Sequence, residues 1–93
     1  MIECELIISA AKNELEKGRP EEALIILDNL IVANSGEAIF LRGEINFKLQ
    51  KWGEALNQFS LFLEKFSDDA KAKSYIAMIH NILGFYHKDL YNP

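Results

Sequence analysis

Apolar residues recur every three to four positions along most of this 93-residue chain. That spacing places them on one side of an α-helix. The stretch 38–66 shows it most clearly, because large aromatic residues lie at helical spacing on both sides of the polar pair Gln50–Lys51. No stretch keeps for long the strict two-residue alternation of a half-buried strand. The pattern therefore predicts an all-α fold.

Breaks in this pattern divide the chain into five predicted helices. Gly18 suits a helix end, and Pro20 suits the first turn of the next helix. Asn34 and Ser35 are both candidates for the N-cap of the third helix. The predicted helices cover residues 2–17, 20–33, 35–50, 52–66 and 68–86, and an irregular tail follows over 87–93.

The same pattern occurs twice, 32 residues apart. Glu22-Ala23-Leu24 matches Glu54-Ala55-Leu56, and Leu27 matches Phe59. Upstream, Ala11 matches Gly43. A repeat built from two helices predicts stacked antiparallel hairpins, each of which buries a face on its neighbour. We therefore expect one domain with hairpins over 2–33 and 35–66 and a further helix over 68–86.

At these positions the chain resembles the tetratricopeptide repeat family, and small stand-alone bacterial proteins of that family in particular. The residues that define the repeat are Ala11, Gly18, Ala23, Leu27, Gly43, Trp52, Ala55 and Phe59. The resemblance implies a right-handed stack of about two and a half repeats, with the fifth helix as a C-terminal cap. The chain departs from the family pattern at Arg42, where leucine is usual, and at Gln50, where a turn glycine is usual.

Charge and composition narrow the function classes. The formal charge of −4 lies mainly in residues 1–37, which hold eight acids and three bases. This balance argues against nucleic acid and anionic membranes as partners. Cys4 has no second cysteine with which to form an internal disulfide, and no apolar run approaches the ~20 residues of a membrane span. We expect a cytoplasmic protein that binds neither nucleic acid nor membrane.

No residue pattern in the chain indicates catalysis. A nucleophile motif and a glycine-rich phosphate loop are both absent from the sequence. His80 and His87 are seven positions apart, a rise of ~10.5 Å along a helix, whereas the ligands of one zinc ion each lie ~2 Å from it. We expect no enzyme activity, no metal site and no cofactor.

The resemblance implies that the first helix of each hairpin lines a concave groove. The residues expected there are Ile8, Lys12, Leu15, Phe40, Glu44, Phe47 and Lys48. The expected function is a protein-interaction module that holds a peptide or helix of a partner protein. That peptide or helix is expected to have an apolar face and some basic character. One alternative remains open. In it, the fifth helix or the aromatic tail of the same chain covers the apolar residues of this groove, which are Ile8, Leu15, Phe40 and Phe47.

The second predicted helix is apolar on nearly all sides. Ile25 and Val32 are expected to face outward, where the matching residues of the fourth helix are polar. Exposed apolar pairs often mark a contact surface. The alternative function is thus a self-associating structural module, for example a homodimer.

Overall fold

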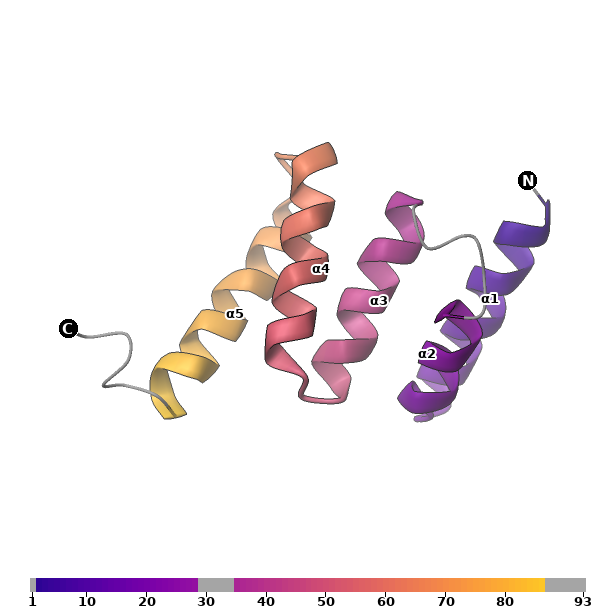
Figure 1. Cartoon of the computed structure of the whole chain (residues 1–93), viewed down its shortest axis with the longest axis horizontal. Helices are drawn as coiled ribbons and strands as arrows, with labels where there is room; N and C mark the ends of the chain where they lie inside the picture. The colour runs from indigo at the N-terminus through magenta and orange to yellow at the C-terminus, as the bar shows by residue number, and fades with distance from the viewer. Residues whose placement is uncertain (1, 29–34, 87–93) are drawn as a thin grey trace.

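The computed structural model describes residues 2–28 and 35–86, and every regular element in these ranges is an α-helix (Figure 1). The helices are α1 (Ile2–Glu16), α2 (Pro20–Asp28), α3 (Gly36–Lys48), α4 (Trp52–Lys65) and α5 (Ala70–Tyr86). The predicted all-α class with five helices is confirmed. Residues 29–33 of the predicted second helix and the tail 87–93 lie outside the described ranges.

The first hairpin turn follows a well-known C-capping geometry. Gly18 has a φ of 80°. Its N–H donates to the carbonyl oxygen of Leu15 at 3.1 Å, and the N–H of Arg19 donates to that of Glu14 at 2.8 Å. These are the two bonds of the Schellman motif, in which a residue with positive φ ends the helix.

The second hairpin turn, 32 residues later, has the same geometry. Gln50 has a φ of 61° and is the one non-glycine residue with positive φ in the part of the chain described. Its N–H donates to the carbonyl oxygen of Phe47 at 3.1 Å, and the N–H of Lys51 donates to the main-chain carbonyl oxygen of Asn46 at 2.9 Å. Gln50 therefore occupies the backbone conformation that glycine adopts at the equivalent position of the first hairpin.

Side chains cap the starts of α3 and α5. Ser35 Oγ accepts a hydrogen bond from the N–H of Ala38 at 3.1 Å. Asp69 Oδ2 accepts from the N–H of Ala72 at 2.9 Å. Both bonds satisfy a backbone donor that has no partner within its own helix. Of the two candidate N-caps before the third helix, the structure uses Ser35.

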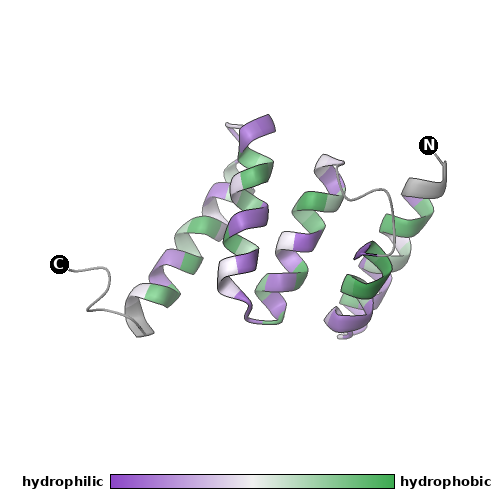
Figure 2. Cartoon of the chain, viewed as in Figure 1, coloured by the Kyte–Doolittle hydropathy of each residue, from purple (hydrophilic) through white to green (hydrophobic). Residues whose placement is uncertain are grey.

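The core consists of two clusters that meet at α3. The first cluster is formed by Ile8, Ala11, Ala23, Leu27, Ala38, Leu41 and Ile45. The second is formed by Ala55, Phe59, Ala72 and Ile79, with half-buried aromatic residues around them. Helix α3 contributes Ala38, Leu41 and Ile45 to the first cluster, and its Phe40 and Phe47 pack against the second. It therefore joins the α1–α2 hairpin to α4 and α5. Hydrophobic and hydrophilic residues are interleaved along the helices, as amphipathic packing requires (Figure 2).

The residues that define the repeat lie at the helix contacts or in the turns. Ala11, Ala23, Ala55 and Phe59 are fully buried, and Gly43 is buried beside them. Trp52 is half-buried at the start of α4 and packs on the second cluster. Figure 1 shows α2 in front of α1 and α4 in front of α5, with α1 and α5 at opposite ends of the row.

The outer face of α5 differs from the corresponding face of α3. Ala38 and Ile45 of α3 have counterparts at Ala72 and Ile79, 34 residues later, and all four are fully buried. With the same offset, the counterparts of Phe40, Gly43 and Phe47 are Ser74, Ala77 and Asn81, which are all exposed. At these three positions α5 is small or polar, whereas α3 has two aromatic rings and a buried glycine.

Candidate functional site

A pocket of about 540 Å³ opens between α1, α3, α4 and the start of α5. Its lining comprises Lys12, Gly36, Glu37, Phe40, Leu41, Glu44, Phe62, Phe66, Asp69 and Lys71. We call it the aromatic pocket, because the side chains of Phe40, Phe62 and Phe66 form its apolar part.

Three phenylalanine rings are held in place by contacts with one another and with the core. The centroids of Phe40 and Phe62 are 5.0 Å apart with an edge-on orientation, and those of Phe62 and Phe66 are 4.8 Å apart. Phe40 also packs edge-on against the fully buried Phe59, at 5.3 Å. Such aromatic pairs are favourable beyond the apolar area that they bury. Phe66 at the end of α4 remains 49% exposed and offers the most accessible apolar surface of the three.

Paired charges surround this apolar surface. Lys12 Nζ lies 3.3 Å from Glu37 Oε2 and joins α1 to α3. Lys71 Nζ lies 3.8 Å from Glu44 Oε2 and 5.5 Å from the centroid of the Phe40 ring. The second distance is within the range of a cation–π contact. Because each lysine faces a carboxylate, these four residues carry no net charge.

Tyr75 of α5 connects the pocket to the core. Its hydroxyl donates a hydrogen bond to Glu44 Oε2 at 2.9 Å. Its ring stacks on Phe59, with centroids 4.5 Å apart and planes inclined by 6°. Burial, and then the hydrogen bond to Glu44 and the charge of that carboxylate, raise the pKa of Tyr75 from 10.0 to about 12. Each of these causes disfavours the tyrosinate anion.

Three of the residues expected to line a groove, Lys12, Phe40 and Glu44, do line the aromatic pocket. Ile8 is only 5% exposed and belongs to the first core cluster, so almost none of its surface is available to a ligand. Leu15 is half-buried and packs on the same cluster.

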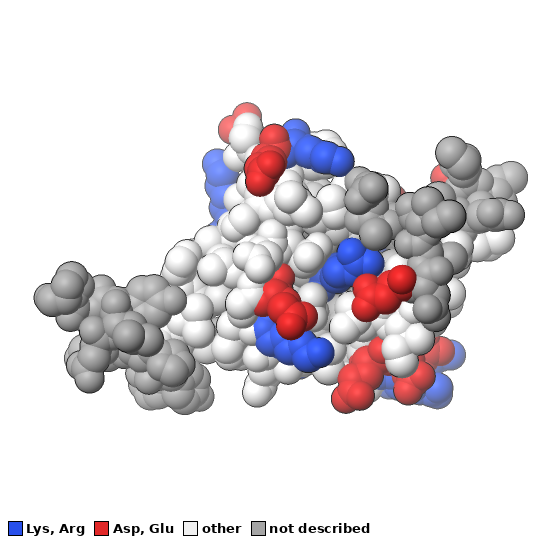
Figure 3. All heavy atoms as spheres, viewed as in Figure 1, with Lys and Arg blue, Asp and Glu red and all other residues white. Residues whose placement is uncertain are grey.

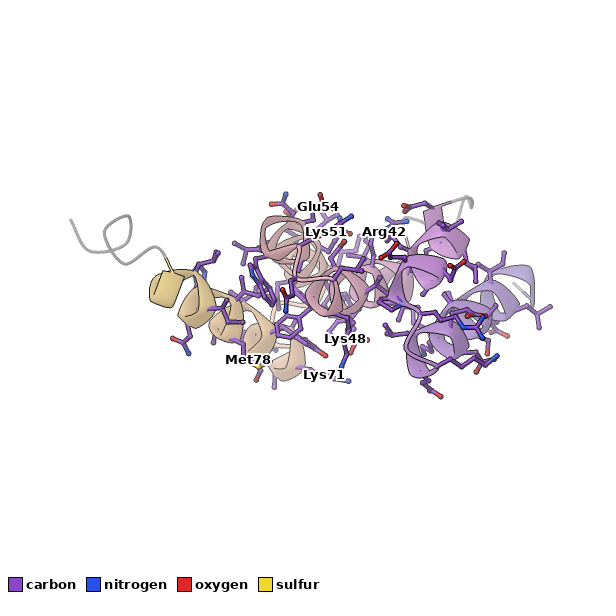
Figure 4. The ribbon with its side chains drawn as sticks, turned by 90° about the horizontal axis from the view of Figure 1, so that it is seen from below. Arg42, Lys48, Lys51, Glu54, Lys71 and Met78 are labelled. Atoms are coloured by element: carbon purple, nitrogen blue, oxygen red, sulfur yellow. The ribbon has the colours of Figure 1, made fainter. Side chains whose placement is uncertain are left out.

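Phe47 and Lys48 lie outside the aromatic pocket. Phe47 packs edge-on between Trp52 and Tyr75, with centroid distances of 5.2 and 5.0 Å. Lys48 is exposed, on the same side of the molecule as Lys71 (Figure 4). Since Tyr75 belongs to α5, the fifth helix covers Phe47 and one side of Phe40. For these two residues, this agrees with the alternative in which the fifth helix covers the apolar residues of the expected groove. The other proposed cover, the aromatic tail, lies outside the described residues.

Sequence reasoning did not assign Phe62, Phe66, Asp69 or Lys71 to a binding surface, because it considered only the first helix of each hairpin. One signal was available in Gly36. A Cβ atom at Gly36 would lie 2.7 Å from the ring of Phe66, so the small residue allows that ring to reach α3.

On the α2 side, Ile25 is 56% exposed. This agrees with the expected outward position of Ile25, whereas Val32 lies outside the part of the chain described. Within the described ranges, no three His, Cys, Asp or Glu side chains are grouped so that they could hold a metal ion. None of the described helices is long and apolar enough to cross a membrane.

Comparison of the chain with protein-family models, with curated proteins and with solved structures finds no match in any of the three.

Proposed function

We propose that the chain is a cytoplasmic, non-catalytic protein-interaction module of the tetratricopeptide-like type, and that it holds an apolar segment of a partner protein in the aromatic pocket. The observation that carries the proposal is the accessible Phe66 ring beside Phe40 and Phe62, within a border in which four of the five charged side chains are already paired. The repeated hairpin turns at Gly18 and Gln50 support the choice of a helical-repeat class.

The chemistry of the pocket favours an apolar anchor over a charged one. Burial of apolar surface contributes roughly 25 cal/mol per Å². Four of the five charged lining residues, Lys12, Glu37, Lys71 and Glu44, already face an opposite charge. We therefore infer that the partner inserts one or two aliphatic or aromatic side chains, as amphipathic helices do in grooves of this kind. The volume of about 540 Å³ is within the range of well-formed binding clefts.

Selection from a displayed peptide library, followed by affinity measurement on the selected peptides, tests this function. Phe66→Ser removes the most exposed wall of the pocket. Leu61→Ser is the matched control, because Leu61 also belongs to α4 and is 44% exposed, but lies outside the pocket. We expect selected peptides to share an apolar anchor and to bind Phe66→Ser at least about tenfold more weakly, a loss of ~1.4 kcal/mol. Equal affinity for the wild type and Phe66→Ser would place binding elsewhere.

A double Phe40→Ala and Phe47→Ala variant is less suitable for this test. Both rings pack on Tyr75 and both are half-buried against the second core cluster, so their removal also takes packing contacts from the core. Loss of binding in that variant would not distinguish a damaged pocket from an unfolded chain.

The second candidate function is self-association through the outer face of α2, which the 56% exposure of Ile25 favours. Light scattering of Ile25→Glu tests it, with Leu6→Glu as the matched control because Leu6 is 64% exposed on α1. A wild-type dimer that becomes monomeric only in Ile25→Glu would support this function. A monomeric wild type would exclude it at the concentrations measured.

A further inference from the structure

Among the residues that the structure describes, Asp69 is the charged lining residue of the aromatic pocket that has no ion-pair partner. The lining holds the carboxylates of Glu37, Glu44 and Asp69 and the ammonium groups of Lys12 and Lys71. Lys12 pairs with Glu37, and Lys71 pairs with Glu44. The border of the pocket therefore carries one uncompensated negative charge, which lies at Asp69.

The turn between α4 and α5 holds Asp69 close to Phe66. The main-chain N–H of Asp69 donates to the carbonyl oxygen of Phe66 at 3.1 Å, and both residues line the aromatic pocket. Phe66 is also the most accessible of the three phenylalanines in the pocket. A single side chain of a partner can therefore contact the ring of Phe66 and the carboxylate of Asp69 together.

One oxygen of the Asp69 carboxylate is engaged by the protein, and the other is available. Oδ2 accepts the N–H of Ala72 at 2.9 Å at the start of α5, whereas Oδ1 has no hydrogen-bond partner within the described ranges. The polar atoms that are enclosed without a partner in those ranges belong to other residues, so Oδ1 is in contact with solvent. The capping bond holds the side chain in one orientation, which makes Oδ1 a preorganised acceptor.

This carboxylate determines what may lie beside an apolar anchor. A purely apolar segment in the pocket would remove water from Asp69, and a charge that loses its water without gaining a partner costs free energy. An anionic side chain would meet a charge of the same sign. A cationic side chain, by contrast, forms a charge-assisted hydrogen bond with Oδ1 and neutralises the border of the pocket.

A guanidinium group suits this position better than an ammonium group. It is planar, so it lies flat on an aromatic ring while the donors at its edge reach a carboxylate. An ammonium group is a more strongly hydrated point charge and makes the two contacts less well together. The pocket already holds one cation against a ring, because Lys71 Nζ lies 5.5 Å from the centroid of Phe40.

We propose that the partner segment carries an arginine beside its apolar anchor, and that this arginine pairs with Asp69 and stacks on Phe66. The anchor fills the pocket next to Phe40 and Phe62. This inference rests on the proposed function, because it is the anchor that brings the arginine to Asp69. It adds a requirement for charge at a fixed spacing to a site that otherwise selects by apolar contact.

The surface around this turn is not uniformly acidic. Figure 3 shows acidic and basic side chains together over the end of α4 and the turn into α5. A general negative field would attract any basic peptide, whereas Asp69 favours an arginine at one spacing from the anchor. Asp68 separates these two effects, because it is the exposed neighbour of Asp69 and lies outside the pocket.

Parallel selections from one displayed peptide library, on the wild type, Asp69→Asn and Asp68→Asn, test the inference. Asparagine caps a helix about as well as aspartate does, so α5 should remain intact in Asp69→Asn. We expect the wild-type and Asp68→Asn pools to share an apolar anchor with arginine enriched at a fixed spacing. The Asp69→Asn pool should keep the anchor and lose the arginine. An anchor without arginine in the wild-type pool would overturn this inference and leave the proposed function intact, whereas a pool without a shared anchor would contradict both.

Affinity measurements on a selected peptide complete the test. Replacement of its arginine by citrulline keeps the shape of the side chain and removes the charge. We expect this change to weaken binding to the wild type and to Asp68→Asn about fivefold, less at high salt, and to leave binding to Asp69→Asn unchanged. Replacement by lysine should weaken binding to the wild type, but not to Phe66→Leu, which has no ring for the guanidinium. An equal citrulline effect in Asp69→Asn and the wild type, or equal binding of arginine and lysine peptides by the wild type, would overturn the proposal.

Discussion

The backbone of Gly43 in α3 lies directly against the ring of Phe59 in α4. A Cβ atom at Gly43 would lie 2.8 Å from both Cε1 and Cζ of that ring, well inside the 3.5–4.0 Å at which carbon atoms pack favourably. The equivalent positions of the first hairpin hold Ala11 and Leu27, which are both fully buried. The two hairpins therefore compensate in size. The first pairs alanine with leucine, and the second pairs the smaller glycine with the larger phenylalanine.

Gly43→Ala is expected to lower the free energy of unfolding by about 1–3 kcal/mol because it overpacks this contact. The loss should appear although alanine is the better helix former by ~1 kcal/mol. Denaturant titration followed by circular dichroism measures it. Gly53→Ala is the control, since nothing lies within 4 Å of a Cβ there, and it should be neutral or stabilising. If both variants lost stability equally, close packing at Gly43 would not be the cause.

Combining Gly43→Ala with Phe59→Leu reproduces the residue pair of the first hairpin. We expect the double variant to be more stable than the sum of the two single losses predicts, because the shorter side chain of leucine makes room for the new methyl group. A double-mutant cycle gives this coupling, which for residues in contact is typically 0.5–3 kcal/mol. A coupling of zero would contradict the packing relationship.

Gln50→Gly is expected to stabilise the protein by about 1 kcal/mol, because a residue with a side chain is strained in the left-handed region. The matched change is Gly18→Gln, which places glutamine at the equivalent position of the first turn, where φ is 80°. It should lower stability by a similar amount. Thermal unfolding of both variants measures the effects, and a change of the same sign in both would contradict the equivalence of the two turns.

Spectrophotometric titration at 295 nm should reveal one tyrosine that ionises near pH 12, the raised pKa of Tyr75. Tyr75→Phe should remove that step and leave the other tyrosine transitions in place. Because the ring remains, the variant should keep the stacking on Phe59 and lose the hydrogen bond to Glu44, worth about 1 kcal/mol. A titration curve unchanged by Tyr75→Phe would assign the raised pKa to another group.

The same pKa shift determines the sign of a pH effect on stability. The pKa of Tyr75 is higher in the folded chain, about 12, than the ordinary value of 10.0, so the folded state holds this proton more tightly. The resulting stabilisation is complete below pH 10 and is lost as the pH rises to about 12. Denaturant midpoints should thus fall over this window in the wild type, and fall less in Tyr75→Phe.

The accessibility of individual residues was the part of the candidate site that sequence could not predict. The family resemblance implied that Ile8 and Phe40 both line a groove. It could not show that Ile8 would be buried among α1, α2 and α3 whereas Phe40 would border an open pocket. That difference depends on Tyr75 and Phe62, whose positions relative to Phe40 follow from how α4 and α5 pack.

The sequence by itself determined the helical class, the number of helices and most helix ends, because these depend on neighbouring residues: apolar spacing, a proline in a first turn, and serine or aspartate at an N-cap. The repeat even indicated that residues 18 and 50 share a role, although Gln50 gives no local sign of its positive φ. Only the tertiary structure decided which apolar side chains stay accessible and that Asn46 is buried without a partner for its oxygen. Periodicity shows which residues share a face of a helix, whereas burial depends on which distant segment covers that face.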